Sequence, residues 1–268
     1  MVRRITCVPT LLGMQRAQER FLYNLFSDNM YHFSNHTAGC ETAEGVVFLD
    51  FRTGQYLAIA ASDVGAFRQG ITGWPSPANI PLAPLEPLSN ESMATLNELS
   101  KRGILSRSPP EHPHVRLRDV PTPTETLPYN RHDNASSMFR LWLNVTLVLC
   151  LFYIWINLKL GRLELIIRNI QSLKRCAHFQ RSPSELARLQ TIVCHFRRTT
   201  LWFYSRQNKC LFDSLVLTRF LYCHDISPTL IFGVRTKPFS AHAWVQISNL
   251  MLVDSPELAL QMTPIFAT

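Results

Sequence analysis

The sequence has few of the patterns that mark a metalloprotein, an ATP-binding protein or a secreted protein. Its seven cysteines include no C-x-x-C pair, and the neighbours Cys194–His195 and Cys223–His224 lack the spacing of zinc ligands. No G-x-x-x-x-G-K-[ST] loop is present, so we expect this chain to bind no cofactor and no metal. The odd number and wide spacing of the cysteines argue against a disulfide framework and favour reduced thiols in the cytoplasm.

Charged residues are also sparse. They make up 17% of the chain and hydrophobic residues 46%, which suits a globular protein and argues against disorder. The net charge is +8, but the basic residues stand in scattered pairs such as Arg197–Arg198, without a long basic tract. We therefore expect a solvated basic surface and no nucleic-acid site.

The N-terminus lacks the pattern of a secretory signal. The apolar stretch after Arg3–Arg4 is short and soon meets Arg16 and Glu19. Residues 1–30 match no pattern and are treated as an unassigned extension. Together with the unpaired cysteines, this start predicts a cytoplasmic protein.

One long apolar run, residues 141–158 with the sequence LWLNVTLVLCLFYIWINL, has no charge but includes Asn144 and Asn157. A helix that spans a bilayer needs about twenty apolar residues, and two amides are costly in hydrocarbon. A buried core helix is therefore favoured. Peripheral membrane contact and a spanning segment stay open as alternatives.

Residues 31–107 have the pattern of a small α+β module similar to a winged helix. The predicted elements are a β-hairpin over 46–51 and 55–60, a helix from Ser62 to Gly70, a helix from Asn90 to Gly103, and a short strand at Ile104–Leu105. Gly54 supplies the turn of the hairpin, because glycine readily adopts the backbone angles that a tight turn requires.

Six prolines between Ser108 and His132 mark a linker, since proline at this density disfavours both helix and sheet. We place the linker at residues 108–137 and a C-terminal domain at 138–268. In that domain, helices are predicted over the apolar run, over 162–176, and from Ser182 to Arg198. Ser182 and Glu185 have the spacing of a capping box, which fixes the start of the third helix.

Three residues of the C-terminal domain are placed as a nucleophile, a base and an orienting acid. Cys210 precedes apolar residues at helical spacing, so it lies in the first turn of a buried helix, where free N–H groups lower a thiol pKa. His242 lies on a predicted strand, on the same face as Trp244, and Asp254 ends the next strand. Cys210 would attack a carbonyl while His242 moves the proton and Asp254 orients the imidazole. Spacing alone leaves a structural cysteine and histidine as the alternative.

The residues around these three carry a more specific pattern. The segment from Gly233 to Phe239 reads GVRTKPF, and it is followed by His242-Ala243-Trp244-Val245 and by Val253-Asp254-Ser255-Pro256. In this G-V-R-x-x-P-F…H-x-W-V…D pattern, the chain resembles the B proteins of lasso-peptide biosynthesis, a family of transglutaminase-like cysteine peptidases. The resemblance covers residues 140–268, and residues 31–106 are similar to the leader-recognition element of such proteins.

The resemblance implies an α+β fold, with a recognition module before a transglutaminase-like or papain-like domain made of a helical part and an antiparallel sheet. It implies that Cys210, His242 and Asp254 remove the leader from a ribosomally made precursor peptide. A separate asparagine-synthetase-like cyclase would then use the ATP and close the macrolactam. An extended leader can bind by adding a strand to an open sheet edge beside an apolar groove. The expected peptide-binding residues are Val47, Leu49, Phe51, Tyr56, Leu57, Leu96 and Leu99, and the expected cleft walls are Arg235, Phe239 and Trp244.

Two other functions stay open. The same three residues would serve a transglutaminase-type acyltransferase or amidase, because hydrolysis and aminolysis share one acyl-enzyme. A DNA-binding regulator would use a winged-helix-like module, but here the second helix carries Lys101 and Arg102 beside Glu91 and Glu98, which makes a poor recognition surface. Glu257 is a second candidate for the orienting acid.

Overall fold

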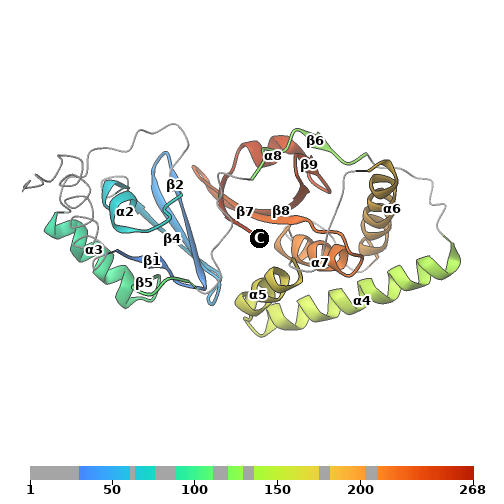
Figure 1. Cartoon of the computed structure of the whole chain (residues 1–268), viewed down its shortest axis with the longest axis horizontal. Helices are drawn as coiled ribbons and strands as arrows, with labels where there is room; N and C mark the ends of the chain where they lie inside the picture. Colours follow the sequence, from blue (N-terminus) through green and yellow to red (C-terminus); the bar gives the residue numbers. More distant parts are fainter. Residues whose placement is uncertain are drawn as a thin grey trace, which may run out of the picture.

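The structure is a computed structural model that describes residues 30–60, 64–75, 89–110, 120–128, 136–174, 182–202 and 210–268. The strands are β1 (His32–Phe33), β2 (Thr37–Thr42), β3 (Gly45–Asp50), β4 (Gln55–Ala60), β5 (Leu105–Ser106), β6 (Glu125–Thr126), β7 (Thr229–Thr236), β8 (Phe239–Ile247), β9 (Leu250–Met251) and β10 (Thr263–Ala267). The helices are α2 (Val64–Gly70), α3 (Asn90–Lys101), α4 (Ser137–Lys159), α5 (Leu163–Lys174), α6 (Pro183–Thr200), α7 (Cys210–Tyr222) and α8 (Pro256–Leu260). Runs of strands alternate with runs of helices, and the sheets are mainly antiparallel, so the predicted α+β class is confirmed (Figure 1).

A three-stranded antiparallel sheet in the order β2-β3-β4 forms the centre of the N-terminal module. The predicted hairpin is its β3–β4 pair, with Asp50 opposite Gln55 and Gly54 at φ 69° in the turn. Helices α2 and α3 cover one face of the sheet and share a core with Phe48 of β3. Strand β2 was not predicted. The predicted cap Ser62 and the extension up to residue 29 lie outside the described residues.

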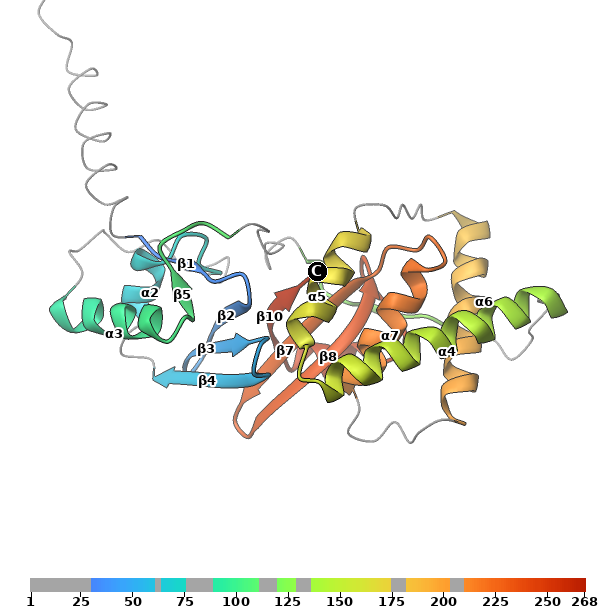
Figure 2. The ribbon, with the colours of Figure 1, turned by 90° about the horizontal axis from the view of Figure 1, so that it is seen from below.

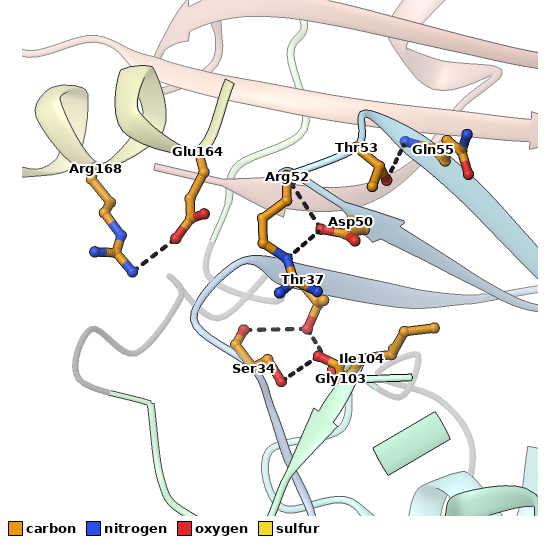
Figure 3. A network of polar contacts seen from close by, with 10 residues as sticks. All are labelled: Ser34, Thr37, Asp50, Arg52, Thr53, Gln55, Gly103, Ile104, Glu164 and Arg168. Atoms are coloured by element: carbon orange, nitrogen blue, oxygen red, sulfur yellow. Dashed lines mark hydrogen bonds and ion pairs between the residues drawn. The ribbon is translucent and has the colours of Figure 1, made fainter. Parts of the chain in front are cut away.

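Polar contacts hold the first turn of the module against the segment that follows α3 (Figure 3). The hydroxyl groups of Ser34 and Thr37 donate to the carbonyl oxygens of Gly103 and Ile104, each at 2.7 Å. These bonds bring β5 beside β1, where the two strands pair antiparallel. The predicted return strand is therefore present, one residue later than predicted.

The other face of the N-terminal sheet packs against the C-terminal sheet. Val47, Leu49 and Phe51 are buried there in the largest hydrophobic core of the described chain. The ring of Phe51 lies 4.8 Å from the ring of Phe266 and 5.9 Å from that of Phe232, between centroids. Figure 2 shows β2 and β3 beside β7 and β10. Strand β3 is thus buried on both faces, which accounts for its continuous apolar sequence.

The C-terminal sheet has five strands in the order β10-β7-β8-β9-β6. The strands predicted at 229–234 and 241–247 are its long central pair, β7–β8, whose register places Gly233 opposite His242. The third predicted strand is shorter than expected, because the chain bends away after Met251. Strand β10 and helix α8 were not predicted. Strand β10 pairs with the outer edge of β7, and α8 lies in the segment that connects β9 to β10.

The described part of the predicted linker runs along this sheet. Strand β6 pairs parallel with β9, with Glu125 opposite Leu250. The side-chain amide of Gln246 donates to the carbonyl oxygen of Pro121 at 2.7 Å. Residues 111–119 and 129–135 lie outside the described residues, and the domain boundary itself stays a prediction.

The three helices predicted before Cys210 are present. The long apolar run forms α4, the run over 162–176 forms α5, and α6 follows the capping serine. The hydroxyl of Ser182 accepts the backbone N–H of Glu185 at 3.3 Å, as the capping pattern predicts. These helices surround α7, whose buried residues fill the space between them and the sheet.

Helix α4 packs one face into the protein. Leu143, Leu147 and Ile154 on that face are fully buried, and the Asn157 amide donates to the carbonyl oxygen of Tyr153 at 2.8 Å. By length and composition, α4 is apolar enough to cross a membrane, yet 39% of its most apolar stretch is buried inside the protein. The favoured prediction of a buried core helix therefore holds for one face of α4, while its other face is exposed.

Candidate active site

Cys210 is the first residue of α7, as predicted. Its thiol is half-buried and faces the backbone N–H groups of Leu211 and Ala243. The hydroxyl of Ser214, one turn further along, donates to the carbonyl oxygen of Ala243 at 2.7 Å and ties the helix to β8. This tie holds the thiol over the middle of β8, beside the next residue of interest.

His242 lies on β8 and faces Asp254, which follows β9. Nε2 of His242 is 3.4 Å from Oδ2 of Asp254, an ion-pair contact that is longer than an ordinary hydrogen bond. The histidine side chain is 14% exposed and the carboxylate 31%. Since Nε2 faces the carboxylate, Nδ1 is the ring nitrogen left for the thiol of Cys210.

The ring of Trp244 packs against the ring of His242. The rings of His242 and Trp244 are stacked, with centroids 6.2 Å apart and planes 13° apart. The indole N–H of Trp244 donates to the side-chain oxygen of Gln246 at 3.0 Å. The three residues alternate along β8 and share one face, as the sequence predicts.

The pKa values of Cys210 and His242 move in opposite directions. The hydrogen bond to His242 lowers the pKa of the Cys210 thiol, against burial, and the N–H groups of Ala243 and Leu211 lower it further. Burial alone would lower the pKa of His242, but contacts with Asp254 and Cys210 outweigh it and raise that pKa to about 9. Between the two pKa values the pair holds a thiolate beside an imidazolium, which is the reactive form of a cysteine nucleophile.

The second candidate acid, Glu257, lies elsewhere. It is exposed in the first turn of α8, where its own backbone N–H and the Ser255 hydroxyl lower its pKa. Asp254 is the carboxylate that faces His242.

A cavity of about 380 Å³ opens beside these residues. It is lined by Phe196, Cys210, Asp213, Ser214, Leu217, Ala241, His242, Val245, Val253 and Asp254. The thiol, the imidazole and the carboxylate therefore all face one space. Within the described ranges, no three His, Cys, Asp or Glu side chains gather as a metal site requires.

The same part of the chain matches a known family. A model of the transglutaminase-like superfamily matches residues 150–267, from the middle of α4 to the end of β10. This part of the chain is therefore similar to the transglutaminase-like superfamily. The match contains Cys210, His242 and Asp254, which the structure brings together around the cavity.

A curated relative agrees with the resemblance to lasso-peptide B proteins. The chain is 36% identical over 52 residues to the microcin J25-processing protein McjB of Escherichia coli. The aligned part is 19% of this chain and 25% of the relative, so it spans about a quarter of that protein's length. No solved structure matches the chain.

None of the three residues expected as cleft walls is among the residues that line the cavity. Trp244 is 2% exposed and backs the histidine. The Arg235 guanidinium donates to the side chain of Gln261 at 3.3 Å. Phe239 is 51% exposed at the start of β8. The three residues lie on β7 and β8, next to the site. Because none of them lines the cavity, the structure gives no evidence that they contact a substrate.

Five residues expected to bind the peptide have buried side chains. Val47, Leu49 and Phe51 pack against the C-terminal sheet, and Leu96 and Leu99 fill the core of the N-terminal module. Their side chains are not available to a peptide in this arrangement.

The remaining two, Tyr56 and Leu57, are half-buried on β4. The ring of Tyr56 meets the ring of Phe239 edge-on, with centroids 5.5 Å apart. Burial, helped by the nearby charge of Cys210, raises the pKa of Tyr56 to about 12. Strand β4 therefore begins close to the candidate nucleophile.

Several cavity residues were missed by sequence reasoning. Asp213 and Ser214 lie three and four residues after Cys210, so helical spacing alone places them on its face and would have found them. Phe196 comes from α6, and no sequence signal links that helix to the site.

A pair of thiols lies away from the cavity. The sulfur atoms of Cys150 on α4 and Cys223 after α7 are 4.0 Å apart. Contact with Cys150, against burial and together with Arg219, lowers the pKa of the exposed Cys223 to about 7. Cys223 is thus a second candidate for alkylation, and experiments on Cys210 should remove it.

We expect iodoacetamide to alkylate Cys210 quickly at pH values below the ordinary thiol pKa of about 8.5, because His242 lowers the pKa of Cys210. The rate should fall as the pH drops through that lowered pKa. The His242→Ala variant should need a higher pH for the same rate. Both would be measured by peptide mass mapping in a Cys223→Ala background. An unchanged pH profile in His242→Ala would contradict the pairing.

Proposed function

We propose that the chain is a cysteine peptidase that removes the leader from a lasso-peptide precursor. The observation that carries this proposal is the thiol of Cys210 at a helix start, beside His242 and Asp254, in one cavity. The match to the transglutaminase-like superfamily and the partial similarity to McjB support it. The freed N-terminal amine of the core peptide would then be the substrate of the next enzyme.

The chemistry of the proposal uses the paired thiolate and imidazolium. The Cys210 thiolate attacks the carbonyl carbon of the scissile peptide bond, and His242 donates its proton to the leaving amine. A water molecule then gives a proton to the neutral imidazole and hydrolyses the thioester. Asp254 holds the ring with Nδ1 toward the sulfur and stabilises the imidazolium. Free N–H groups in the first turn of α7 would stabilise the oxyanion.

The N-terminal module would hold the leader. Strand β4 is an edge of its sheet, and the edge opposite β3 is unpaired among the described residues. Leu57 and Ile59 on β4 and Met93 on α3 are partly exposed apolar side chains that rest on the module's core. An extended peptide could add to this edge by backbone hydrogen bonds and bury side chains on that surface. The buried Val47, Leu49, Phe51, Leu96 and Leu99 would act as the support beneath it.

The proposed partners are the precursor peptide and a separate asparagine-synthetase-like cyclase in the cytoplasm. The cyclase would use ATP to close the macrolactam. In this scheme the chain itself performs a hydrolysis, which needs no nucleotide.

The experiment is incubation of the full chain with the precursor peptide from a neighbouring gene, followed by mass spectrometry. We expect two products whose masses sum to that of the precursor plus one water. Adding the cyclase and ATP should convert the core product to a species lighter by one water. An intact precursor, with and without the cyclase, would overturn the proposal.

A second function, acyl transfer to an amine, is favoured by the match to the transglutaminase-like superfamily. Hydrolysis and aminolysis diverge only at the acyl-enzyme. The same incubation in the presence of a primary amine separates them. A product that carries the amine at the acyl carbon, in place of a free carboxylate, would identify a transferase.

Replacing Asp254 by asparagine should slow cleavage by about 10²- to 10³-fold without abolishing it, because Asp254 orients the base and does not itself react. The loss of negative charge should also lower the pKa of His242, so the alkaline limb of the pH–rate profile should move below its expected position near 9. Glu257→Gln is the matched control and should leave rate and pH profile unchanged. A larger effect from Glu257→Gln would reverse the assignment of the acid.

A further inference from the structure

Helix α4 presents a second apolar face, and this one is uncovered. The exposed side chains along it are Met138, Leu141, Trp142, Val145, Val148, Leu149, Phe152, Trp155 and Ile156. Leu149 is 63% exposed and Phe152 60%, values ordinary for a surface lysine but high for large apolar residues. In Figure 1, α4 runs along the lower edge of the molecule, and in Figure 2, seen from below, it passes in front of α6 and α7.

The position of α4 is fixed by its opposite face. Besides the apolar residues buried there, the Thr146 hydroxyl lies 3.2 Å from Nε2 of His224, which follows α7. Crossing a bilayer would require α4 to leave this core. An apolar helix that keeps one face in the protein can place only its other face in an apolar medium.

The composition of the uncovered face indicates what that medium is. Between its two borders, the side chains of this face are aliphatic or aromatic and offer no hydrogen-bonding group. The polar groups at the borders are the indoles of Trp142 and Trp155 and the exposed amide of Asn144. Protein interfaces typically carry about one hydrogen bond per 100–200 Å², with a polar rim. This face has no such groups at its centre. The hydrocarbon of a lipid layer has none to offer in return.

The two tryptophans of α4 lie at the borders of its exposed apolar face, where a bound lipid layer would meet water. At 100° per residue, Trp142 and Trp155 fall on opposite borders of the uncovered face, about 140° apart, and about 20 Å apart along the axis. A helix lying flat in the headgroup region places its borders at the boundary between lipid and water. Indole rings favour that boundary because they are apolar with one polar N–H.

The charges around the face suit an anionic lipid surface. Helix α4 contains no acidic residue, and its exposed basic residues Arg140 and Lys159 stand near its two ends. Arg162 is exposed just beyond the helix. The Lys159 stem can lie along the apolar face while its ammonium group reaches the headgroups. The net charge of the chain, +8, acts in the same direction.

We propose that the uncovered face of α4 docks the protein on an anionic membrane surface, with the helix parallel to the bilayer and the rest of the chain in water. Docking of this kind depends on buried apolar area and on attraction to anionic headgroups. It leaves the cavity at Cys210 outside the bilayer. The inference does not depend on the proposed peptidase function.

The test is sedimentation of the full chain with phosphatidylcholine vesicles, with and without phosphatidylglycerol. We expect binding to the anionic vesicles, weakened by added salt. The double variant Leu149→Gln/Phe152→Gln should bind at least about tenfold more weakly, because both side chains would otherwise enter the lipid. The variant Lys159→Glu/Arg162→Glu should lose the preference for anionic vesicles.

Leu260→Gln is the matched control, since Leu260 is also 63% exposed and belongs to α8, a helix at the opposite edge of the molecule from α4 (Figure 1). It should bind vesicles as the wild type does. All variants should keep the wild-type unfolding temperature, because the replaced side chains face solvent. Absence of vesicle binding by the wild type would overturn the proposal. So would a dimer that the Leu149→Gln/Phe152→Gln variant dissociates without any vesicle binding, which would assign the face to a second copy of the chain.

Discussion

Replacing Cys210 with alanine should reduce precursor cleavage by about 10⁴-fold or more, because the variant has no atom that can form the acyl-enzyme. Leader binding should be unchanged, since the proposed recognition edge belongs to β4 and its backbone is untouched. The measurements are the cleavage rate by mass spectrometry and the affinity for a labelled leader peptide. Loss of cleavage with retained binding would separate a catalytic role of Cys210 from a structural one.

The matched control is Cys223→Ala. Cys223 is exposed, has a pKa lowered to about 7, and is therefore the other thiol able to act as a nucleophile among the described cysteines. Its removal should leave the cleavage rate within a factor of about two. Cleavage that survives Cys210→Ala and disappears in Cys223→Ala would refute the assignment of the nucleophile.

Replacing Gly233 with valine should destabilise the protein by about 3 kcal/mol or more. Gly233 lies on β7 opposite His242, and a Cβ there would be 2.6 Å from Cζ3 of Trp244 and 2.9 Å from Cβ of Met262. Trp244 is 2% exposed, so moving its ring would require neighbouring buried side chains to shift. Because its ring stacks on His242, displacement of the ring should also misplace the imidazole and slow cleavage.

The free energy of unfolding in urea and the cleavage rate of the folded fraction would be measured together. Gly65→Ala in α2 is the control, because a Cβ at Gly65 meets nothing within 4 Å. That change should be neutral or stabilise by up to about 1 kcal/mol, since alanine favours a helix. A Gly233→Val protein as stable as the wild type would contradict the close packing of glycine and indole.

Elements with local signals could be predicted from the sequence. The Ser182 cap, the turn at Gly54 and the alternation along β8 each depend on neighbouring residues, so sequence alone locates them. The contact between His242 and Asp254 was also predicted, although Asp254 lies in the bend after β9 and not at the end of a strand as the sequence suggested.

Elements that depend on distant partners could not be predicted. Strand β10 is short and begins next to proline, and its strand form depends on pairing with β7. Phe196 enters the cavity because α6 crosses α7, which no periodicity in α6 reveals. The apolar run of β3 does carry a signal of its burial on both faces. Apolar and polar residues do not alternate along β3, because both of its faces are buried. The buried side chains of such a strand cannot contact a bound peptide.

The packing of the N-terminal sheet on the C-terminal sheet has a consequence for substrate choice. Glu44 in the β2–β3 turn bonds the Thr236 hydroxyl and lies 3.7 Å from Nζ of Lys237, and Phe51 fills the space between Phe232 and Phe266. These contacts hold β4 at a set distance from Cys210. A precursor that binds β4 and is cleaved at Cys210 would have to span this fixed distance. The number of residues between anchor and scissile bond, more than the side chains around that bond, would then determine where the chain is cut.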